Sequence, residues 1–186
     1  GLVGSEMCIR DSSRYSQIPP YLFAEIDKKK LEAVKQGKKI ISLGVGDPDM
    51  PTPNIIVEAG KKALENPDNH HYPFGSGLPE FRNTVSGWMK KRFSLKLDPD
   101  SQIMPLMGSK EGLAHILLAF VEPGEYVLVP EPGYPLYYNA SIFACGKPYY
   151  MPLLEKNGFM PDFKAIPRDV LKKSRIIFLN YPNNPT

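Results

Sequence analysis

Cysteine is scarce in this sequence, and long apolar runs are missing from it. The 186 residues include two cysteines, Cys8 and Cys145, which lie too far apart for a CxxC metal or redox motif and are too few for a disulfide framework. No apolar run approaches the roughly 18 residues of a membrane-spanning helix. The first residues also lack the charged and apolar regions of a secretory signal. We therefore expect free thiols and a soluble, cytoplasmic protein that does not enter membranes.

Charge of one sign is not in excess either. Lysine and arginine number 23 against 20 aspartates and glutamates, which gives a net charge of +3, and the basic residues are spread along the chain. This pattern excludes nucleic acid as an expected partner. The three histidines form no metal-ligand constellation, and His115 is expected to be half-buried in an apolar helix. No metal site is expected, and the missing Gly-x-Ser-x-Gly motif leaves serine hydrolase chemistry without support.

The hydrophobic pattern that is present alternates between helices and short buried strands. Apolar spacing predicts helices from Pro19–Pro20 to Gly37, over 53–66, over 78–93, between Gly108 and Pro123, and over 134–144. Short apolar runs predict strands at 38–43, 102–107, 126–129, 149–153 and 175–179. This order is typical of an α/β domain with a mainly parallel sheet, in which ligands bind outside the carboxyl ends of the strands.

The two ends of the chain differ from its middle. Residues 1–12 show no periodicity and no turn logic that connects them to the rest of the chain, so we interpret them as a non-native leader. At the other end the chain stops at Thr186, one step past a predicted strand and within a loop. We interpret the sequence as a fragment of a longer protein.

A glycine-flanked segment, Gly108–Gly112, lies between a predicted strand and a predicted helix. Free N–H groups and the positive end of the helix dipole favour a phosphate at such a point. Ser109 can add a hydroxyl group and Lys110 a positive charge. The segment is not a P-loop, because GxxxxGK[ST] is absent. Phosphate binding is therefore weighed against the alternative that Ser109 only caps the helix.

Two further residues follow predicted strands. Tyr134 lies in the turn Glu131–Pro135, where its ring could stack on a flat cofactor or could simply pack within the turn. Asn184 lies in Asn183–Thr186, a common type of loop sequence. Neither residue is specific by itself.

Six segments taken together, in this order, resemble the class I/II pyridoxal-phosphate-dependent aminotransferases. The branch with the strongest resemblance is that of the LL-diaminopimelate aminotransferases, whose opening Pro-Pro-Tyr-Leu-Phe-Ala-Glu-Ile is matched at Pro19–Ile26. The resemblance runs from Arg14 to Thr186 and covers about the N-terminal half of a family member. The six segments are LGVGDPD at 43–49, HYP at 71–73, GLPEFR at 77–82, GSKEG at 108–112, EPGYP at 131–135 and YPNNPT at 181–186.

This resemblance implies an α/β fold: the three-layer α/β/α large domain of the fold type I transferases, with a mainly parallel sheet that is incomplete here. Residues 13–50 are then expected to contribute to a small domain and the substrate pocket, and 51–186 to form the first part of the large domain. The cofactor would be pyridoxal 5′-phosphate.

The resemblance also implies roles for individual residues. Ser109 and Lys110 would bind the cofactor phosphate, and Tyr134 would lie at the pyridine ring. Asn184 would hydrogen-bond the phenolic oxygen of the ring, and Tyr72 would reach the cofactor phosphate of the neighbouring subunit in a homodimer. Two residues would face the substrate: Tyr21 would line its pocket, and Gly46 would lie against its carboxylate, where a glycine permits close backbone approach.

No catalytic residue is expected in this chain. In the family the Schiff-base lysine lies beyond the match to Asn184–Thr186, so this chain by itself is expected to be inactive, and Lys110 matches a phosphate-site residue instead. The expected reaction transfers an amino group between an amino acid and a 2-oxo acid, as in lysine biosynthesis. The loop after Tyr72 lacks the glutamate that diaminopimelate enzymes commonly carry there, which keeps alanine and aspartate open as substrates.

Two alternatives to an aminotransferase remain. The first is another pyridoxal-phosphate enzyme on the same scaffold, such as a carbon–sulfur lyase or a cyclopropane-carboxylate synthase, which would release ammonia instead of forming the pyridoxamine form. The second is a non-catalytic binding module, which would leave a sheet with an exposed edge.

Overall fold

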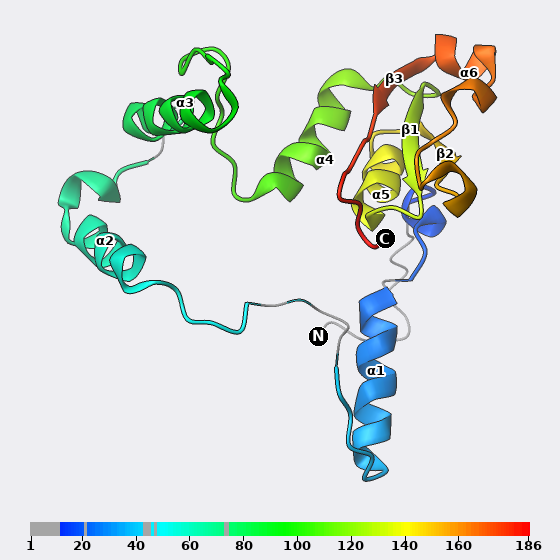
Figure 1. Cartoon of the computed structure of the whole chain (residues 1–186), viewed down its shortest axis with the longest axis horizontal. Helices are drawn as coiled ribbons and strands as arrows, with labels where there is room; N and C mark the ends of the chain where they lie inside the picture. The colour runs from blue at the N-terminus through cyan, green and yellow to red at the C-terminus, as the bar shows by residue number, and fades with distance from the viewer. Residues whose placement is uncertain (1–11, 21, 43–45, 47, 73–74) are drawn as a thin grey trace. The chain divides into compact units, whose positions relative to one another are not determined.

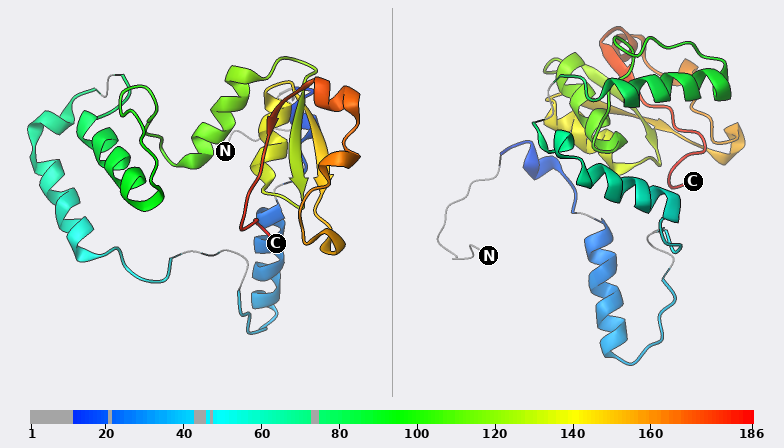
Figure 2. Two further views of the ribbon diagram at one scale, coloured as in Figure 1. Left: turned by 45° about the horizontal axis from the view of Figure 1, so that its top comes forward. Right: turned by 90° about the vertical axis from the view of Figure 1, so that its left-hand side faces the viewer.

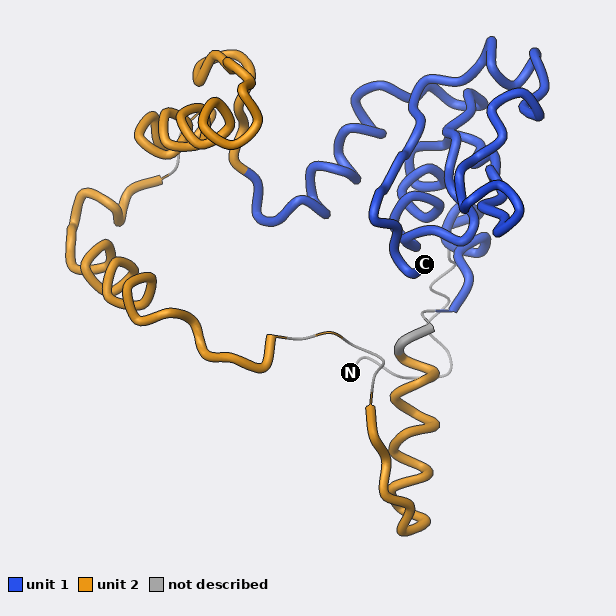
Figure 3. Tube along the Cα trace, viewed as in Figure 1, with its two compact units in different colours: residues 1–20, 106–186 blue, residues 21–105 orange. Residues whose placement is uncertain are grey.

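The computed structural model describes residues 12–20, 22–42, 46, 48–72 and 75–186 (Figure 1). Its contacts divide the chain into two compact units (Figure 3). Unit 1 contains the described residues up to Pro20 together with Leu106–Thr186, and unit 2 is Tyr21–Pro105. Among the described residues, no helix combines the length and the apolar character that crossing a membrane requires.

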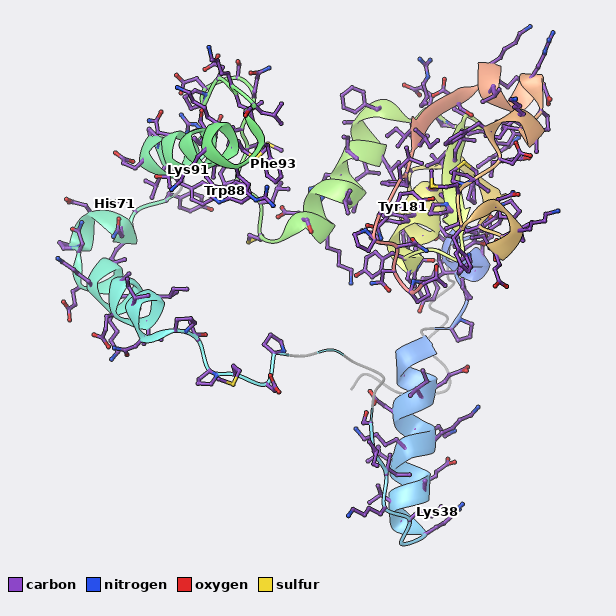
Figure 4. The ribbon with its side chains drawn as sticks, in the orientation of Figure 1. Lys38, His71, Trp88, Lys91, Phe93 and Tyr181 are labelled. Atoms are coloured by element: carbon purple, nitrogen blue, oxygen red, sulfur yellow. The ribbon has the colours of Figure 1, made fainter. Side chains whose placement is uncertain are left out.

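Unit 2 is built from helices, and their positions confirm the periodicity of the sequence. It contains α1 (Leu22–Lys35), α2 (Asn54–Glu65), the 3₁₀ helix η2 (Pro67–His70) and α3 (Pro79–Phe93). Helix α3 begins with a proline, whose fixed φ suits the first helical position. Its last turn is basic, which suits the negative end of the helix dipole. There Trp88 meets Phe93 edge to face at 5.3 Å between ring centroids (Figure 4).

A buried arginine organises the start of α3. Arg82 donates hydrogen bonds to the carbonyl oxygens of Ser76, Gly77 and Pro99, and its guanidinium lies 2.9 Å from Oδ1 of Asp100. Only 8% of Arg82 is exposed. The side chain therefore links the turn that precedes α3 to the loop that comes after it.

Two of the predicted strands are wrong. Residues 38–42 and 102–107 form no strand, and the remaining residue of the first prediction, Leu43, lies outside the described residues. Ile41 and Met107 are 83% and 90% exposed instead of buried. The physical reason is that a strand needs a neighbour to complete its hydrogen bonds, and neither segment has one in the described chain.

Unit 1 contains the parallel sheet that the sequence predicts. Its strands are β1 (Tyr126–Glu131), β2 (Lys147–Pro152) and β3 (Ser174–Ile177), in the order β2-β1-β3. Both pairings of β1 are parallel; Tyr126 aligns with Lys147 on one side and with Ser174 on the other. Helix α5 (Pro135–Phe143) connects β1 to β2, and α4 (Ser109–Phe120) precedes β1. The return to β3 passes through η3 (Glu155–Asn157), η4 (Phe163–Ala165) and α6 (Arg168–Lys172).

Helices cover both faces of this sheet (Figure 2). On one face, Val127 and Val129 of β1 pack with Leu117 of α4 and with buried residues of α5. On the other face, Leu128 packs with Val170 of α6 and with Met151 of β2. The α/β fold with a parallel sheet and three layers is thus confirmed, and the sheet is small.

The N-terminal segment of unit 1 packs on α5. It contains the 3₁₀ helix η1 (Tyr15–Gln17). Nη1 of Arg14 donates to the carbonyl oxygen of Phe143 at 3.4 Å, and the Tyr138 hydroxyl donates to the carbonyl oxygen of Gln17 at 3.2 Å. Unit 1 is therefore made of two stretches that are far apart in the sequence.

Candidate functional site

Helix α4 begins as an uncapped helix N-terminus. Its N-cap is Gly108, with φ 83°, and no side chain caps the helix. Ser109 is the first helical residue, so the alternative that its side chain serves as the N-cap is wrong. The first N–H groups of a helix have no partner within it and, together with the dipole, favour an anion. Ser109 and Lys110 are both exposed at this point, where a hydroxyl and an ammonium group can join the backbone N–H groups.

Tyr134 lies close to the same helix end. It is the N-cap residue of α5 and is half-buried. Nζ of Lys110 lies 5.8 Å from the centroid of the Tyr134 ring, within the range of a cation–π contact. The structure thus brings together two residues that the sequence suggested separately.

Two further aromatic rings pack in series behind the Tyr134 ring. Its ring meets that of Tyr137 edge to face, with centroids 5.9 Å apart, and Tyr137 is stacked on Phe178 at 4.3 Å. Burial, and then the neighbouring Tyr134, raise the pKa of Tyr137 above its ordinary value. The neutral form of Tyr137 is thus favoured further, and its ring acts as a packed support for Tyr134.

The loop after β3 reaches the loop after β1 through Asn183. Its Nδ2 donates to the carbonyl oxygen of Pro132 at 3.1 Å and to Oγ1 of Thr186 at 2.8 Å. Asn184, the residue singled out in the sequence, is its exposed neighbour in the same loop. Sequence reasoning missed the linking role of Asn183, because its partner Pro132 is 51 residues away in the sequence.

One atom of this link has no partner. Oδ1 of Asn183 is buried and accepts no hydrogen bond from the described residues. A buried amide oxygen without a donor costs free energy. The polar loop beside Tyr134 thus has spare hydrogen-bonding capacity, as expected of a loop that contributes to a binding site.

The other predicted site residues belong to unit 2 or lie outside the described residues. Tyr72 and Gly46 belong to unit 2, where Tyr72 is exposed and a Cβ added to Gly46 would meet nothing within 4 Å. Tyr21 lies outside the described residues. The roles of these three residues stay predictions.

Metal ligation finds no support in the described part of the chain, where no group of three or more His, Cys, Asp or Glu side chains could hold an ion.

The expectation that His115 is half-buried is wrong: its side chain is exposed on α4. The helix has apolar residues on more than one side, and the sheet covers only the side that contains Leu117.

Three features of unit 1 can each be matched to a part of a ligand. An anionic group fits the N-terminus of α4, a flat ring fits the Tyr134 side chain, and a polar ring substituent fits the loop of Asn183 and Asn184. A phosphate ester of an aromatic ring carries all three features.

Comparison with known proteins identifies relatives of this chain. The family model "Aminotransferase class I and II" matches residues 38–186. LL-diaminopimelate aminotransferase of Aquifex aeolicus is 59% identical over 175 residues, which are 94% of this chain and 45% of that protein. The enzyme of the same name from Syntrophobacter fumaroxidans is 50% identical over 180 residues, 97% of this chain and 46% of that protein.

Solved structures agree with this result. BacF from Bacillus subtilis superposes with a TM-score of 0.86 at 38% identity and covers 95% of this chain and 45% of its own. A probable N-succinyldiaminopimelate aminotransferase from Thermus thermophilus gives 0.81 at 36% identity, over 89% of this chain and 45% of its own. The chain thus spans about 45% of the length of these relatives. The match over most of the chain and the shared fold show that it belongs to the class I and II aminotransferase family.

Proposed function

We propose that the protein is a pyridoxal-phosphate-dependent aminotransferase that transfers an amino group between an amino acid and a 2-oxo acid. The observation that carries this proposal is the juxtaposition of Lys110 and Tyr134 at the N-terminus of α4. It fits a cofactor that is both a phosphate ester and a flat ring, and the class I and II aminotransferases are pyridoxal-phosphate-dependent.

The residues of unit 1 fit the parts of this cofactor. Ser109 and Lys110, with the N–H groups of α4, would hold the phosphate, while the Tyr134 ring would lie against the pyridine ring. Asn184 would hydrogen-bond the phenolic oxygen, in a loop whose neighbouring amide oxygen has no donor. When bound, the cofactor supplies an electron sink for the substrate's α-carbon, and the protein holds phosphate, ring and oxygen in fixed positions.

Lys110 is assigned to the phosphate and not to covalent attachment of the cofactor. Its ammonium group belongs to the first turn of α4, where it neutralises negative charge together with the helix dipole. We assign no catalytic residue to this chain. We expect the chain by itself to be inactive.

The substrate proposed first is LL-diaminopimelate, because the relatives at 59% and 50% identity carry that name. Against it stands the loop after Tyr72, where Phe74–Ser76 offers no carboxylate for the distal ammonium group; Phe74 lies outside the described residues. L-Alanine and L-aspartate are therefore the second candidates. An alanine aminotransferase from Pyrococcus furiosus is among the similar structures, with a TM-score of 0.83 at 31% identity over 95% of this chain and 45% of its own.

The test uses the full product of the gene, loaded with pyridoxal phosphate. Each amino donor is added separately, without a 2-oxo acid, and conversion to the pyridoxamine form is followed by absorbance. We expect LL-diaminopimelate to convert the enzyme at the lowest concentration. Preference for alanine or aspartate would move the assignment to that type, and ammonia release without the pyridoxamine form would indicate a lyase.

The remaining predictions also stay proposals. These are a cytoplasmic location, a non-native leader at 1–12, a contribution of 13–50 to a small domain, and the start of the large domain at 51–186. We also propose a homodimer in which Tyr72 reaches the cofactor phosphate of the partner subunit. Light scattering on the full gene product tests the dimer, and a monomeric mass would contradict it.

A further inference from the structure

Glu111 turns its carboxylate back toward the residues that precede its own helix. Oε2 accepts a hydrogen bond from the backbone N–H of Met107 at 2.8 Å. Oε1 lies 3.8 Å from Nδ1 of His115, one turn further along α4. The side chain is partly buried, with 31% of its surface exposed. One carboxylate oxygen thus accepts from the backbone of Met107, and the other faces the ring of His115.

The contact closes a ring around the candidate phosphate site. The hydrogen bond joins Glu111 to Met107, so Gly108, Ser109 and Lys110 lie inside the loop that it forms. Gly108 has φ 83° and a glycine has no side chain with which to cap the helix. A loop with such a flexible residue needs another interaction to fix its shape. In the described chain, the hydrogen bond that Met107 donates to Glu111 supplies that interaction.

A carboxylate in this turn needs a reason. Near a phosphate a negative charge raises the cost of binding, so a residue that served only to complete the helix could equally be neutral. A general benefit to the helix dipole is the alternative explanation, since acidic residues stabilise any first turn. The hydrogen bond to Met107 goes beyond a dipole effect, which does not require it. It also resembles the capping box of helix N-termini in general, so phosphate affinity has to be measured to show a role in the site.

We propose that Glu111 is a positioning residue, which holds the 107–110 loop in the shape that binds the cofactor phosphate. The proposal rests on the proposed function, because it assumes a phosphate at α4. Glu111 touches neither cofactor nor substrate; it acts through the backbone of Met107. Its hydrogen bond, and not its charge, is what the site requires.

The test compares two variants of the full gene product. Glu111→Ala removes the acceptor, whereas Glu111→Gln keeps an acceptor oxygen for Met107 and removes the charge. We expect Glu111→Ala to raise the dissociation constant for pyridoxal phosphate by up to about tenfold, as for the loss of one hydrogen bond. Glu111→Gln should stay within about twofold of the wild type. Binding of pyridoxal, which lacks the phosphate, should not change in either variant.

The control is Glu80→Ala, which removes an acidic residue from the first turn of α3. It should leave the dissociation constant unchanged. Hydrogen exchange of the Met107 amide reports on the contact directly, and we expect its protection to be lost in Glu111→Ala and kept in Glu111→Gln.

Two outcomes would overturn the inference. If Glu111→Ala binds pyridoxal phosphate with unchanged affinity, the loop does not depend on Glu111. If Glu111→Gln loses as much affinity as Glu111→Ala, the charge acts instead of the hydrogen bond. Failure of the wild type to bind pyridoxal phosphate would contradict the proposed function and the site role that depends on it. Met107 protection would still decide whether the contact exists.

Discussion

The side chain of Arg82 is the most fully bonded polar group described in unit 2. Arg82 donates hydrogen bonds to carbonyl oxygens that come before and after α3 in the sequence. We expect Arg82→Ala to lower the free energy of unfolding by about 2–4 kcal/mol, because these bonds from a charged group are lost. Asp100 adds little, since its side chain is exposed. Urea denaturation measures the change.

Two further variants make the Arg82 experiment specific. Arg82→Lys should recover only part of the loss, because an ammonium group cannot reproduce the planar fork of a guanidinium. Arg92→Ala, on the exposed end of the same helix, removes one cation–π contact with Phe93 at 5.0 Å and should cost less than about 1 kcal/mol. Equal effects of Arg82→Ala and Arg92→Ala would contradict the role of Arg82.

A pH effect is expected from Glu125. The backbone N–H of Glu122, and then the guanidinium of Arg175 at 2.6 Å, hold the pKa of this carboxyl below its ordinary value. A lowered pKa in the folded state means that the stabilisation is present above the unfolded pKa of about 4.3 and is lost as the pH falls through the folded pKa. Unfolding free energies measured from about pH 6 to pH 3 should therefore fall less steeply in Glu125→Gln than in the wild type. Parallel curves would refute the effect.

How far the site could be predicted from the sequence depends on what each residue does. Ser109, Lys110 and Tyr134 were singled out because glycine-flanked helix starts and turns after strands are local patterns, and the structure places Lys110 beside Tyr134. Their cofactor roles stay predictions. Asn183 was missed because its role is a bond to Pro132, which is 51 residues away. Nothing local encodes that contact.

Helix α4 positions the site by means of one buried face. Leu117 is 0% exposed between α4 and β1, whereas Leu118, the next residue, is 61% exposed. Leu117→Ala should lower the free energy of unfolding by about 2–5 kcal/mol, the range for a buried leucine that leaves a cavity. Leu118→Ala changes the same atoms at an exposed position and should cost less than about 1 kcal/mol. Similar losses, measured by urea denaturation, would show that the helix is packed differently.

Helices and strands differed in how well the sequence predicted them. The helices α2 and α3 match their predicted ranges to within one residue at each end, because their hydrogen bonds are internal and their apolar spacing is local. Strands at 38–42 and 102–107 were wrong, although both segments contain apolar residues. A strand is completed by a neighbour, and β1, β2 and β3 are the segments that have one in the described chain.

At the scale of the whole molecule, Asn183 connects two loops that belong to different strands. Asn183→Ala removes its bonds to Pro132 and Thr186, so the loop that contains Asn184 should lose its link to the loop after β1. In the full gene product we expect a dissociation constant for pyridoxal phosphate that is about fivefold higher, as for one neutral hydrogen bond. Spectroscopic titration measures this constant.

The matched control for Asn183 is Asn69→Ala. It removes a similar side-chain bond, to the carbonyl oxygen of Ala63 in unit 2, and should leave cofactor affinity unchanged. If both asparagine variants weaken cofactor binding equally, the link between the two loops is not what sets the affinity.

The two-stretch construction of unit 1 fixes an order of events during synthesis. Arg14 and Gln17 leave the ribosome long before Phe143 and Tyr138, the residues on α5 with which they bond. These contacts close a loop that contains residues 21–105. Closing such a long loop costs conformational entropy, and the contacts that offset this cost can form only after α5 has folded. The N-terminal segment is thus the first part of unit 1 to be made, it cannot take its place until α5 has folded, and until then it is open to chaperones and proteases.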